Sequence, residues 1–278
     1  MSTPNTPAET AQDKAARLRA LHVPGVPLVL PNAWDAASAR AAEAAGSPAV
    51  ATSSAATAAV LGYADAEAAP VTEVLAAAGR MVRAVRVPVT VDFERGYGLR
   101  PAELVERLAA TGAVGLNLED SHPRTAELVD AAEQAEFLAA VRDAASAQGV
   151  DLVLNARTDC FLRRAGTPPE QLAAALDRGT RYLAAGADCV YPIAVTDPTV
   201  IRALVEGIPG PVNVGHGPGG ALSPDGLAEL GVARVTFGPG LQRHLYDTYG
   251  AALFTAVARA QSPYARSAGE GVSSPVVM

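Results

Sequence analysis

Short apolar runs alternate along the chain with alanine-rich stretches that have the hydrophobic spacing of helices. The apolar runs predict eight strands, and the stretches of about 10–18 residues between them predict helices. The predicted strands are 27–31, 48–52, 88–92, 114–118, 151–156, 188–191, 211–214 and 233–237. The predicted helices are 35–45, 70–86, 101–112, 127–148, 169–185, 197–206, 224–230 and 240–261.

Eight strand–helix units predict an α/β protein, a single (β/α)₈ barrel of the TIM type with a C-terminal helical extension. Closing the sheet hides every strand edge, which favours the barrel over a doubly wound open sheet, the alternative. We expect a polar N-terminal extension over residues 1–22, the barrel catalytic domain over 23–262 and a flexible C-terminal tail over 263–278.

The charge and the apolar runs exclude several classes of partner. A net charge of −7 disfavours nucleic acid and anionic membranes as partners. The longest apolar runs, such as 55–61 and 150–154, are far below the roughly 18 residues of a membrane span. The first twenty residues lack the apolar segment of a secretory signal, and two cysteines form no disulfide framework. We therefore expect a cytoplasmic protein.

Lysine is almost absent from the chain. The only one is Lys14, in the N-terminal lead-in, so no lysine amine is available inside the fold. Schiff-base aldolase and pyridoxal chemistry both require such an amine. Lysine-dependent covalent catalysis is therefore excluded.

Three carboxylates follow two neighbouring strands at the end of the barrel where active sites lie. Asp92 and Glu94 are two residues apart at the end of the third strand, and Glu119 ends the fourth. Like charges brought together repel, and Mg²⁺, which takes one or two carboxylates and keeps several waters, relieves the repulsion. The alternative is that these acids cap helices or pair with Arg95, Arg100 or Arg157. We interpret the cluster as a metal site.

Two further strand ends carry candidate substrate-binding residues. Arg157, after the fifth strand, could clamp a carboxylate or phosphonate, or could pair with a neighbouring acid; both can hold. Asn213 and His216 follow the seventh strand, where barrels often bind phosphate. The alternative for this segment is a tight glycine turn.

Five short motifs follow one another along the chain in an order and spacing that is specific when they are taken together. They are Leu-Pro-Asn-Ala-Trp-Asp at 30–35, Leu-Gly-Tyr-Ala-Asp at 61–65, Val-Asp-Phe-Glu-Arg-Gly-Tyr-Gly at 91–98, Leu-Asn-Leu-Glu-Asp at 116–120 and Ala-Arg-Thr-Asp at 156–159. Together they resemble the isocitrate lyase/phosphoenolpyruvate mutase superfamily over nearly the whole barrel.

The resemblance implies a metal site and a substrate site. Asp92 would bind Mg²⁺ (or Mn²⁺) directly, Glu94 would replace the family's second aspartate, and Glu119 and Asp65 would complete the shell, largely through waters. The segment Ser53, Ser54 and Ala55 would hold the substrate's carboxylate, and Arg157 would contact its other polar groups. The family's assembly implies a homo-oligomer, a tetramer that exchanges its C-terminal helix.

The chain departs from the family in the loop after the fourth strand. The segment 121–128 lacks the cysteine and lysines of the isocitrate and methylisocitrate lyases and the Lys-x-Asn of the mutases. His122 could replace the missing acid/base, or could be an idle loop histidine. We therefore expect the decarboxylase-like or uncharacterised branch.

The function expected from these features is that of a Mg²⁺-dependent carbon–carbon lyase. It would act on a small 2-oxo or 2-hydroxy (di)carboxylic acid through a stabilised enolate, as in oxaloacetate decarboxylation, with Asp92, Arg157 and His122 as catalytic residues. The alternatives are a phosphonopyruvate-type P–C hydrolase or mutase, and a non-catalytic acid binder.

Overall fold

The computed structural model describes residues 9–218 and 220–264. Contacts divide the chain into two compact units, Met1–Leu241 and Gln242–Met278, and each is described here by itself. The predicted extension (1–22) and tail (263–278) lie partly outside the described residues, at 1–8 and 265–278. The predicted domain boundaries stay a prediction.

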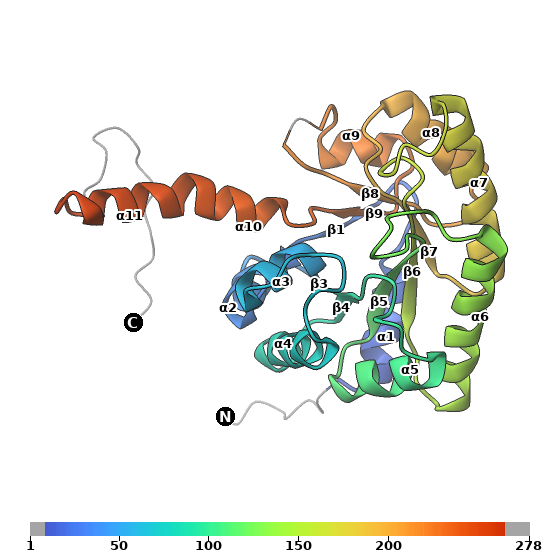
Figure 1. The fold of residues 1–278 in the computed structure, drawn as a ribbon, viewed down its shortest axis with the longest axis horizontal. Coiled ribbons are helices and arrows are strands. Elements are labelled where there is room, and N and C mark those ends of the chain that lie inside the picture. Colours follow the sequence, from blue (N-terminus) through green and yellow to red (C-terminus); the bar gives the residue numbers. More distant parts are fainter. Residues whose placement is uncertain (1–8, 219, 265–278) are drawn as a thin grey trace, which may run out of the picture. The chain divides into compact units, whose positions relative to one another are not determined.

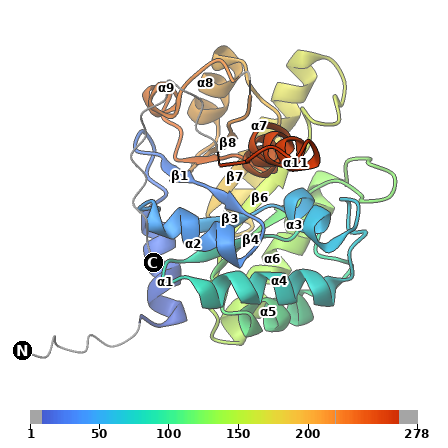
Figure 2. The same ribbon diagram turned by 90° about the vertical axis from the view of Figure 1, so that its left-hand side faces the viewer.

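The first unit is built on parallel strands in two sheets that meet (Figures 1 and 2). Its strands are β1 (Leu28–Leu30), β2 (Asn32–Ala33), β3 (Val50–Thr52), β4 (Val89–Asp92), β5 (Gly115–Glu119), β6 (Val153–Thr158), β7 (Cys189–Pro192), β8 (Asn213–Gly215) and β9 (Arg234–Thr236). One sheet has the order β2-β3-β4-β5-β6-β7 and the other β1-β9-β8. Pro31 alone separates β1 from β2, and a parallel bridge from Val190 to Val212 links β7 to the segment that enters β8. The sheet therefore closes, which confirms the predicted α/β barrel.

Helices surround the strands (Figure 2). They are α1 (Ala11–Ala20), α2 (Ala36–Ala44), α3 (Ser54–Leu61), α4 (Val71–Ala84), α5 (Pro101–Ala110), α6 (Ala131–Ala147), α7 (Pro168–Ala184), α8 (Pro198–Gly207) and α9 (Pro224–Glu229). The stretch that follows contains α10 (Gly240–His244), a π-helical turn (Leu245–Gly250) and α11 (Ala251–Ala258). Each predicted strand and helix overlaps an observed one, with four differences in the helices.

The first difference is α1, in a segment predicted to be an extension. Its N-cap Thr10 and Asp13 form a capping box, and Ala15 and Leu18 are fully buried. Leu18 packs with inward-facing strand residues such as Leu28 and Val153, so α1 closes one end of the barrel. The buried stripe is only two residues wide, which is too weak a pattern to identify from the sequence.

The other differences concern helix limits. The predicted helix 127–148 begins only at Ala131, because Asp130 accepts hydrogen bonds from the N–H groups of Ala132 (2.8 Å) and Glu133 (3.3 Å) and so caps it. The alanine-rich α3 lies between the predicted strand 48–52 and the predicted helix 70–86, where no helix was predicted. The predicted helix 240–261 is interrupted by the π-helical turn.

Alternation along the strands separates two kinds of side chain. Outward residues such as Val91 and Leu116 pack under the helices in the main hydrophobic core. Inward residues become polar towards the carboxyl ends of the strands, as Thr90, Asn117 and Asn155 show, all buried. Barrel interiors are usually filled by branched apolar residues, so this polar interior marks the end that carries chemistry.

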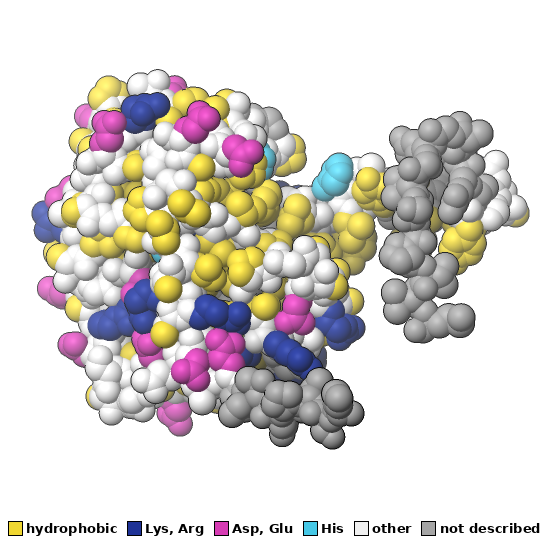
Figure 3. Space-filling view, turned by 180° about the vertical axis from the view of Figure 1, so that it is seen from behind, with side chains coloured by type: hydrophobic (Ala, Val, Ile, Leu, Met, Phe, Trp, Pro, Cys, Tyr) yellow, Lys and Arg dark blue, Asp and Glu magenta, His cyan; other side chains and the backbone are white. Residues whose placement is uncertain are grey.

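The surface adds two observations. No helix within the described ranges has both the length and the apolar character needed to cross a membrane. On the face of the barrel in Figure 3, acidic and basic side chains are interspersed around a band of hydrophobic ones.

Candidate active site

Asp92, the last residue of β4, is fixed by its neighbours on the barrel rim. Its N–H donates to Oγ1 of Thr52 (2.9 Å), and its Oδ2 accepts the N–H of Ser54 (3.0 Å) in the first turn of α3, which Ser53 caps. Its Oδ1 is buried and has no hydrogen-bond partner in the part of the chain that the structure describes. A buried carboxylate oxygen without a donor is costly, and a cation would relieve that cost.

Glu94 lies just beyond β4 and is almost fully buried. Its Oε1 accepts the hydroxyl of Tyr97 (2.6 Å) and its Oε2 the N–H of Glu67 (2.6 Å). Burial raises the pKa of Glu94 to about 7, although the Tyr97 hydroxyl opposes the shift; the charges of Asp92 and Asp65 raise it further. Glu94 is therefore held by protein donors and lies in a field of uncompensated negative charge.

The side chain of Glu67 in turn accepts hydrogen bonds from the loop that contains Glu94, so the two glutamates link their two loops. Its Oε1 accepts the N–H groups of Arg95 (3.1 Å) and Tyr97 (2.7 Å), in the loop that follows Glu94. Glu67 and Glu94 both have positive φ angles (57° and 48°), a conformation that non-glycine residues rarely adopt. The sequence analysis did not identify Glu67, because the pairing of two distant loops has no local signal.

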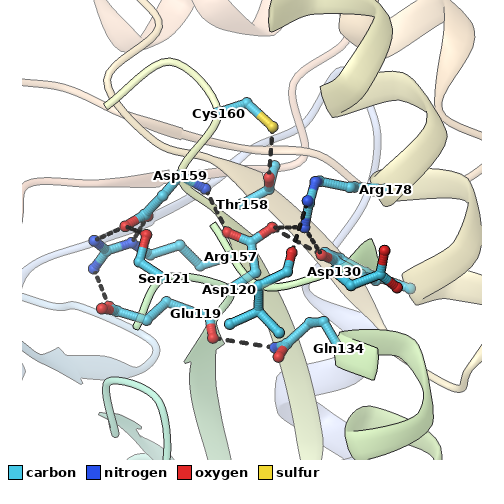
Figure 4. Close-up of polar contacts among 12 residues, drawn as sticks. Glu119, Asp120, Ser121, Asp130, Gln134, Arg157, Thr158, Asp159, Cys160 and Arg178 are labelled. Atoms are coloured by element: carbon cyan, nitrogen blue, oxygen red, sulfur yellow. Dashed lines mark hydrogen bonds and ion pairs between the residues drawn. The ribbon is translucent and has the colours of Figure 1, made fainter. Parts of the chain in front are cut away.

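Arg157 on β6 lies between two acids (Figure 4). Its Nη1 contacts Oε2 of Glu119 (2.7 Å), while Nε and Nη2 donate to Oδ1 (2.6 Å) and Oδ2 (3.1 Å) of Asp159. Burial alone would lower the pKa of Arg157, but these two carboxylates raise it. Burial raises the pKa of Glu119, against the effect of Arg157, and the charges of Asp159 and Asp92 add to the rise. The ion-pair alternative for Arg157 is thus present.

Asp120 forms a second network behind this pair (Figure 4). It is fully buried, and its Oδ2 accepts from Arg178 Nη1 (3.0 Å) and the Tyr182 hydroxyl (2.8 Å) of α7. Its Oδ1 accepts the N–H of Asp159 (2.8 Å). Asp120 therefore fixes the backbone of the residue that holds Arg157.

The remaining predicted residues lie around this centre. Asp65 is exposed in the α3–α4 connection, near enough to Glu94 to act on its pKa. Asn213 is buried, with its Oδ1 accepting from Thr236 (3.2 Å). His216 packs edge-on against Phe237 with ring centroids 5.7 Å apart. His122 lines a cavity with Arg95 and Tyr97. The structure thus brings Asp92, Glu94, Glu119 and Arg157 together and places His122 on the wall of that cavity.

Arg234, on β9, is a buried residue that the sequence analysis missed. It is fully buried beside Asn213 in the strand register, and its Nη2 is 3.4 Å from Oδ1 of Asn117. Burial lowers its pKa. An arginine within a strand pattern normally faces solvent, so only the closed barrel shows that it points inward.

The donor set can be compared with the needs of Mg²⁺. Among the described residues, no three His, Cys, Asp or Glu side chains form a ready-made metal cluster. The free Oδ1 of Asp92 and the negative field at Glu94 nevertheless fit a hard cation, which commonly takes one or two carboxylates and several waters.

Comparison with known proteins identifies the family. The family model of phosphoenolpyruvate phosphomutase matches residues 18–257. The chain belongs to the isocitrate lyase/phosphoenolpyruvate mutase superfamily. This is a superfamily of lyases and mutases that act on small acids. A phosphonopyruvate hydrolase of the same fold was crystallised with oxalate and Mg²⁺.

Three relatives show how broad the likeness is. An uncharacterized protein of Mycobacterium tuberculosis (strain ATCC 25618 / H37Rv) is 35% identical over 218 residues, 78% of this chain and 80% of its own. Oxaloacetate decarboxylase of Rhodopseudomonas palustris (strain TIE-1) is 32% identical over 229 residues, 78% of this chain and 76% of its own. A crystal structure from Burkholderia cenocepacia J2315 is 43% identical with a TM-score of 0.83, covering 87% of this chain and 99% of the other. The superfamily predicted from the motifs is confirmed.

Proposed function

We propose that this protein is a Mg²⁺-dependent lyase that cleaves a carbon–carbon bond of a small 2-oxo or 2-hydroxy dicarboxylic acid, with oxaloacetate decarboxylation as the leading reaction. One observation carries the proposal: the buried, unpartnered Oδ1 of Asp92 beside the negative field at Glu94. A divalent cation chelated by a 2-oxo acid is the ligand that satisfies both the free oxygen and the excess charge.

Arg157 supplies the substrate's counter-charge. Three of its five N–H groups make the contacts with Glu119 and Asp159. Within the described part of the chain, one N–H on Nη1 and one on Nη2 therefore remain available for a substrate. Both acids lock the guanidinium plane, so the remaining donors are oriented before a substrate arrives. Such an arrangement suits a carboxylate oxygen and limits the entropy lost on binding.

The first turn of α3 supplies further donors. Ser53 caps the helix, and Ser54 already donates its N–H to Asp92. The N–H groups of Ala56 and Thr57 already donate to Ser53. The positive end of a helix favours an anion, so the N–H of Ala55 would face the second carboxylate of the acid. The helix N-terminus thus stabilises Asp92 and receives the substrate.

Asp92 would hold the metal directly, with Glu94, Glu119 and Asp65 acting through waters. When bound there, Mg²⁺ supplies a Lewis acid for the oxygen that gains charge. In decarboxylation the breaking C–C bond leaves its electron pair on the three-carbon fragment, and carbon dioxide departs. A proton then returns to that carbon to give pyruvate. No lid-borne acid is needed at the broken bond, which agrees with the short segment 121–128.

The test is pyruvate release from oxaloacetate by the purified protein with Mg²⁺ and with EDTA, after subtraction of the metal's own solution reaction. We expect enzyme-dependent release that EDTA abolishes. Phosphate release from phosphonopyruvate instead would establish P–C chemistry. Metal-dependent oxalate binding without turnover of either compound would leave an acid-binding protein.

We also propose that the protein is a homo-oligomer, a tetramer. The described part of the second unit presents large exposed apolar side chains on one helical stretch: Leu245, Tyr246, Tyr249, Leu253, Phe254 and Val257. None of the residues in the π-helical turn or α11 is buried. Contiguous apolar surface of this kind is typical of an interface. Light scattering with size-exclusion chromatography tests this, and a monomer at micromolar concentration would contradict it.

A further inference from the structure

A cavity of about 470 Å³ lies at the rim of the barrel, outside the carboxylate cluster. Three connections and one helix form its wall: Ala66 and Glu67, the segment 95–99, residues 122–124, and Phe137 of α6. We call it the rim cavity. Its volume is in the range of pockets that bind ligands much larger than a four-carbon acid.

The rim cavity shares a wall with the candidate active site. Tyr97 and Glu67, which line it, both donate to the carboxylate of Glu94 at 2.6 Å. Arg95, also on the wall, lies 3.5 Å from the backbone oxygen of Glu119 through its Nη1. A substrate held at Asp92 and extended outwards past Glu94 would therefore meet this cavity.

The lining is apolar on one side. Leu99, Pro123 and Phe137 offer carbon surface, and the guanidinium carbon of Arg95 lies 5.8 Å from the centre of the Phe137 ring. Gly98 has a φ angle of +64°, and a Cβ placed there would meet nothing within 4 Å. This wall suits a hydrocarbon or aromatic stem.

The lining also carries charged groups, and they differ in whether their hydrogen-bonding groups are already used. The carboxylate of Glu67 accepts two backbone N–H groups, and the Arg95 guanidinium is occupied by Gln134 and by Glu133 (3.1 Å). Arg124, in contrast, forms no side-chain ion pair or hydrogen bond within the described ranges; only its backbone N–H contacts His122 Nδ1 (3.4 Å). An unpaired guanidinium at the mouth of a cavity is a receptor for an anionic group.

We propose that the rim cavity receives the distal part of the substrate, an apolar stem that ends in a carboxylate recognised by Arg124. This inference rests on the proposed function and extends its substrate class from oxaloacetate to longer 2-oxo or 2-hydroxy diacids. The segment 121–128, short as it is, would then serve in specificity rather than in proton transfer.

Equilibrium binding with Mg²⁺ tests the proposal, using oxalate, lactate, phenyllactate and 4-carboxyphenyllactate in isothermal titration calorimetry. Phenyllactate adds the stem, and 4-carboxyphenyllactate adds both the stem and the distal charge. We expect 4-carboxyphenyllactate to bind about tenfold more tightly than phenyllactate, as for a charge-assisted hydrogen bond. In Arg124→Gln that advantage should disappear, with the loss confined to the ligand that carries the distal carboxylate.

Arg202→Gln is the matched control, because Arg202 is an exposed arginine on α8, away from the cavity wall. It should keep the full advantage, and Arg124→Lys should restore part of it. If oxalate does not bind to the native protein, the proposed function fails. If oxalate binds but 4-carboxyphenyllactate has no advantage, or keeps it in Arg124→Gln, the proposed role of the cavity is wrong and the proposed function stands.

Discussion

Two pairs of acids at the same barrel rim differ in how their charge is compensated. Asp120 and Asp159 are both fully buried, and each contacts at least one arginine: Arg178 for the first, and Arg157 and Arg163 for the second. Asp92 and Glu94 contact no arginine in the described part of the chain. They receive only backbone N–H groups and a tyrosine hydroxyl.

The origin of the arginines explains the difference. They come from β6, from the loop that follows it and from α7, so they reach only one side of the rim. Asp92 and Glu94 belong to the end of β4, two strands away in the same sheet. Among the described residues their carboxylates directly contact two backbone N–H groups and the Tyr97 hydroxyl, and no cation. The charges of Asp120 and Asp159 are therefore compensated within a structural network, whereas Asp92 and Glu94 lack a positive charge in contact with them. Four predictions test this difference, in order of decreasing expected effect.

Asp92→Asn should have the largest effect, on metal binding and turnover. The substitution removes the charge of a carboxylate that has a buried, unpartnered oxygen. We therefore expect Mn²⁺ affinity to fall at least about tenfold and oxaloacetate turnover to be abolished. The apoprotein should be no less stable, because an uncompensated charge is removed. Electron paramagnetic resonance of Mn²⁺ measures the affinity. Unchanged turnover would rule out Asp92 as the metal ligand.

Asp120→Ala should cost the most stability. It would leave Arg178 buried without its carboxylate and the Asp159 N–H without an acceptor, a loss of about 3–5 kcal/mol in free energy of unfolding. Urea denaturation measures the change. Asp177→Ala is the control, because Asp177 pairs with Arg181 on an exposed helix face and should change stability by less than about 1 kcal/mol. Equal effects would contradict the assignment of Asp120 to a structural network.

Glu94→Gln should alter the pH dependence of the apoprotein. The folded pKa of Glu94 is raised to about 7, so the folded state binds its proton more tightly than the unfolded chain does. The contribution of Glu94 to the free energy of unfolding is therefore fully present at low pH and is lost as pH rises from about 4.5 to 7. In the variant, the free energy of unfolding should no longer fall over this pH range and should be about 1–2 kcal/mol higher than that of the native protein at pH 8. An unchanged slope in thermal melts at several pH values would show that Glu94 stays charged.

His122→Ala should have the smallest effect. His122 lines the rim cavity, and among the described residues its side chain contacts the N–H of Arg124 and not a carboxylate of the site, so kcat for oxaloacetate should change less than about threefold. Steady-state kinetics with excess Mg²⁺ measures it. A loss of a hundredfold or more would restore His122 as the acid/base that the sequence analysis considered.

The site could be predicted in part from the sequence. Asp92, Glu119 and Arg157 each end an apolar strand, and that position alone points their side chains to one rim. Glu67 and Arg234 could not be found in this way. Glu67 lies in a loop that comes close to Glu94 only when the chain is folded. From the sequence Arg234 would be placed at the surface, and only the closed barrel shows that it is buried.

The eight strand–helix repeats and the family could be inferred from the amino-acid sequence, because both depend on local alternation and on short motifs. Which acids are neutralised by arginines could be seen only in the folded chain. That depends on where α7 and the rim loops place Arg157, Arg163 and Arg178, a long-range property of the closed barrel. The sequence likewise gave no sign of the rim cavity, because three connections from separate parts of the chain must meet to form it.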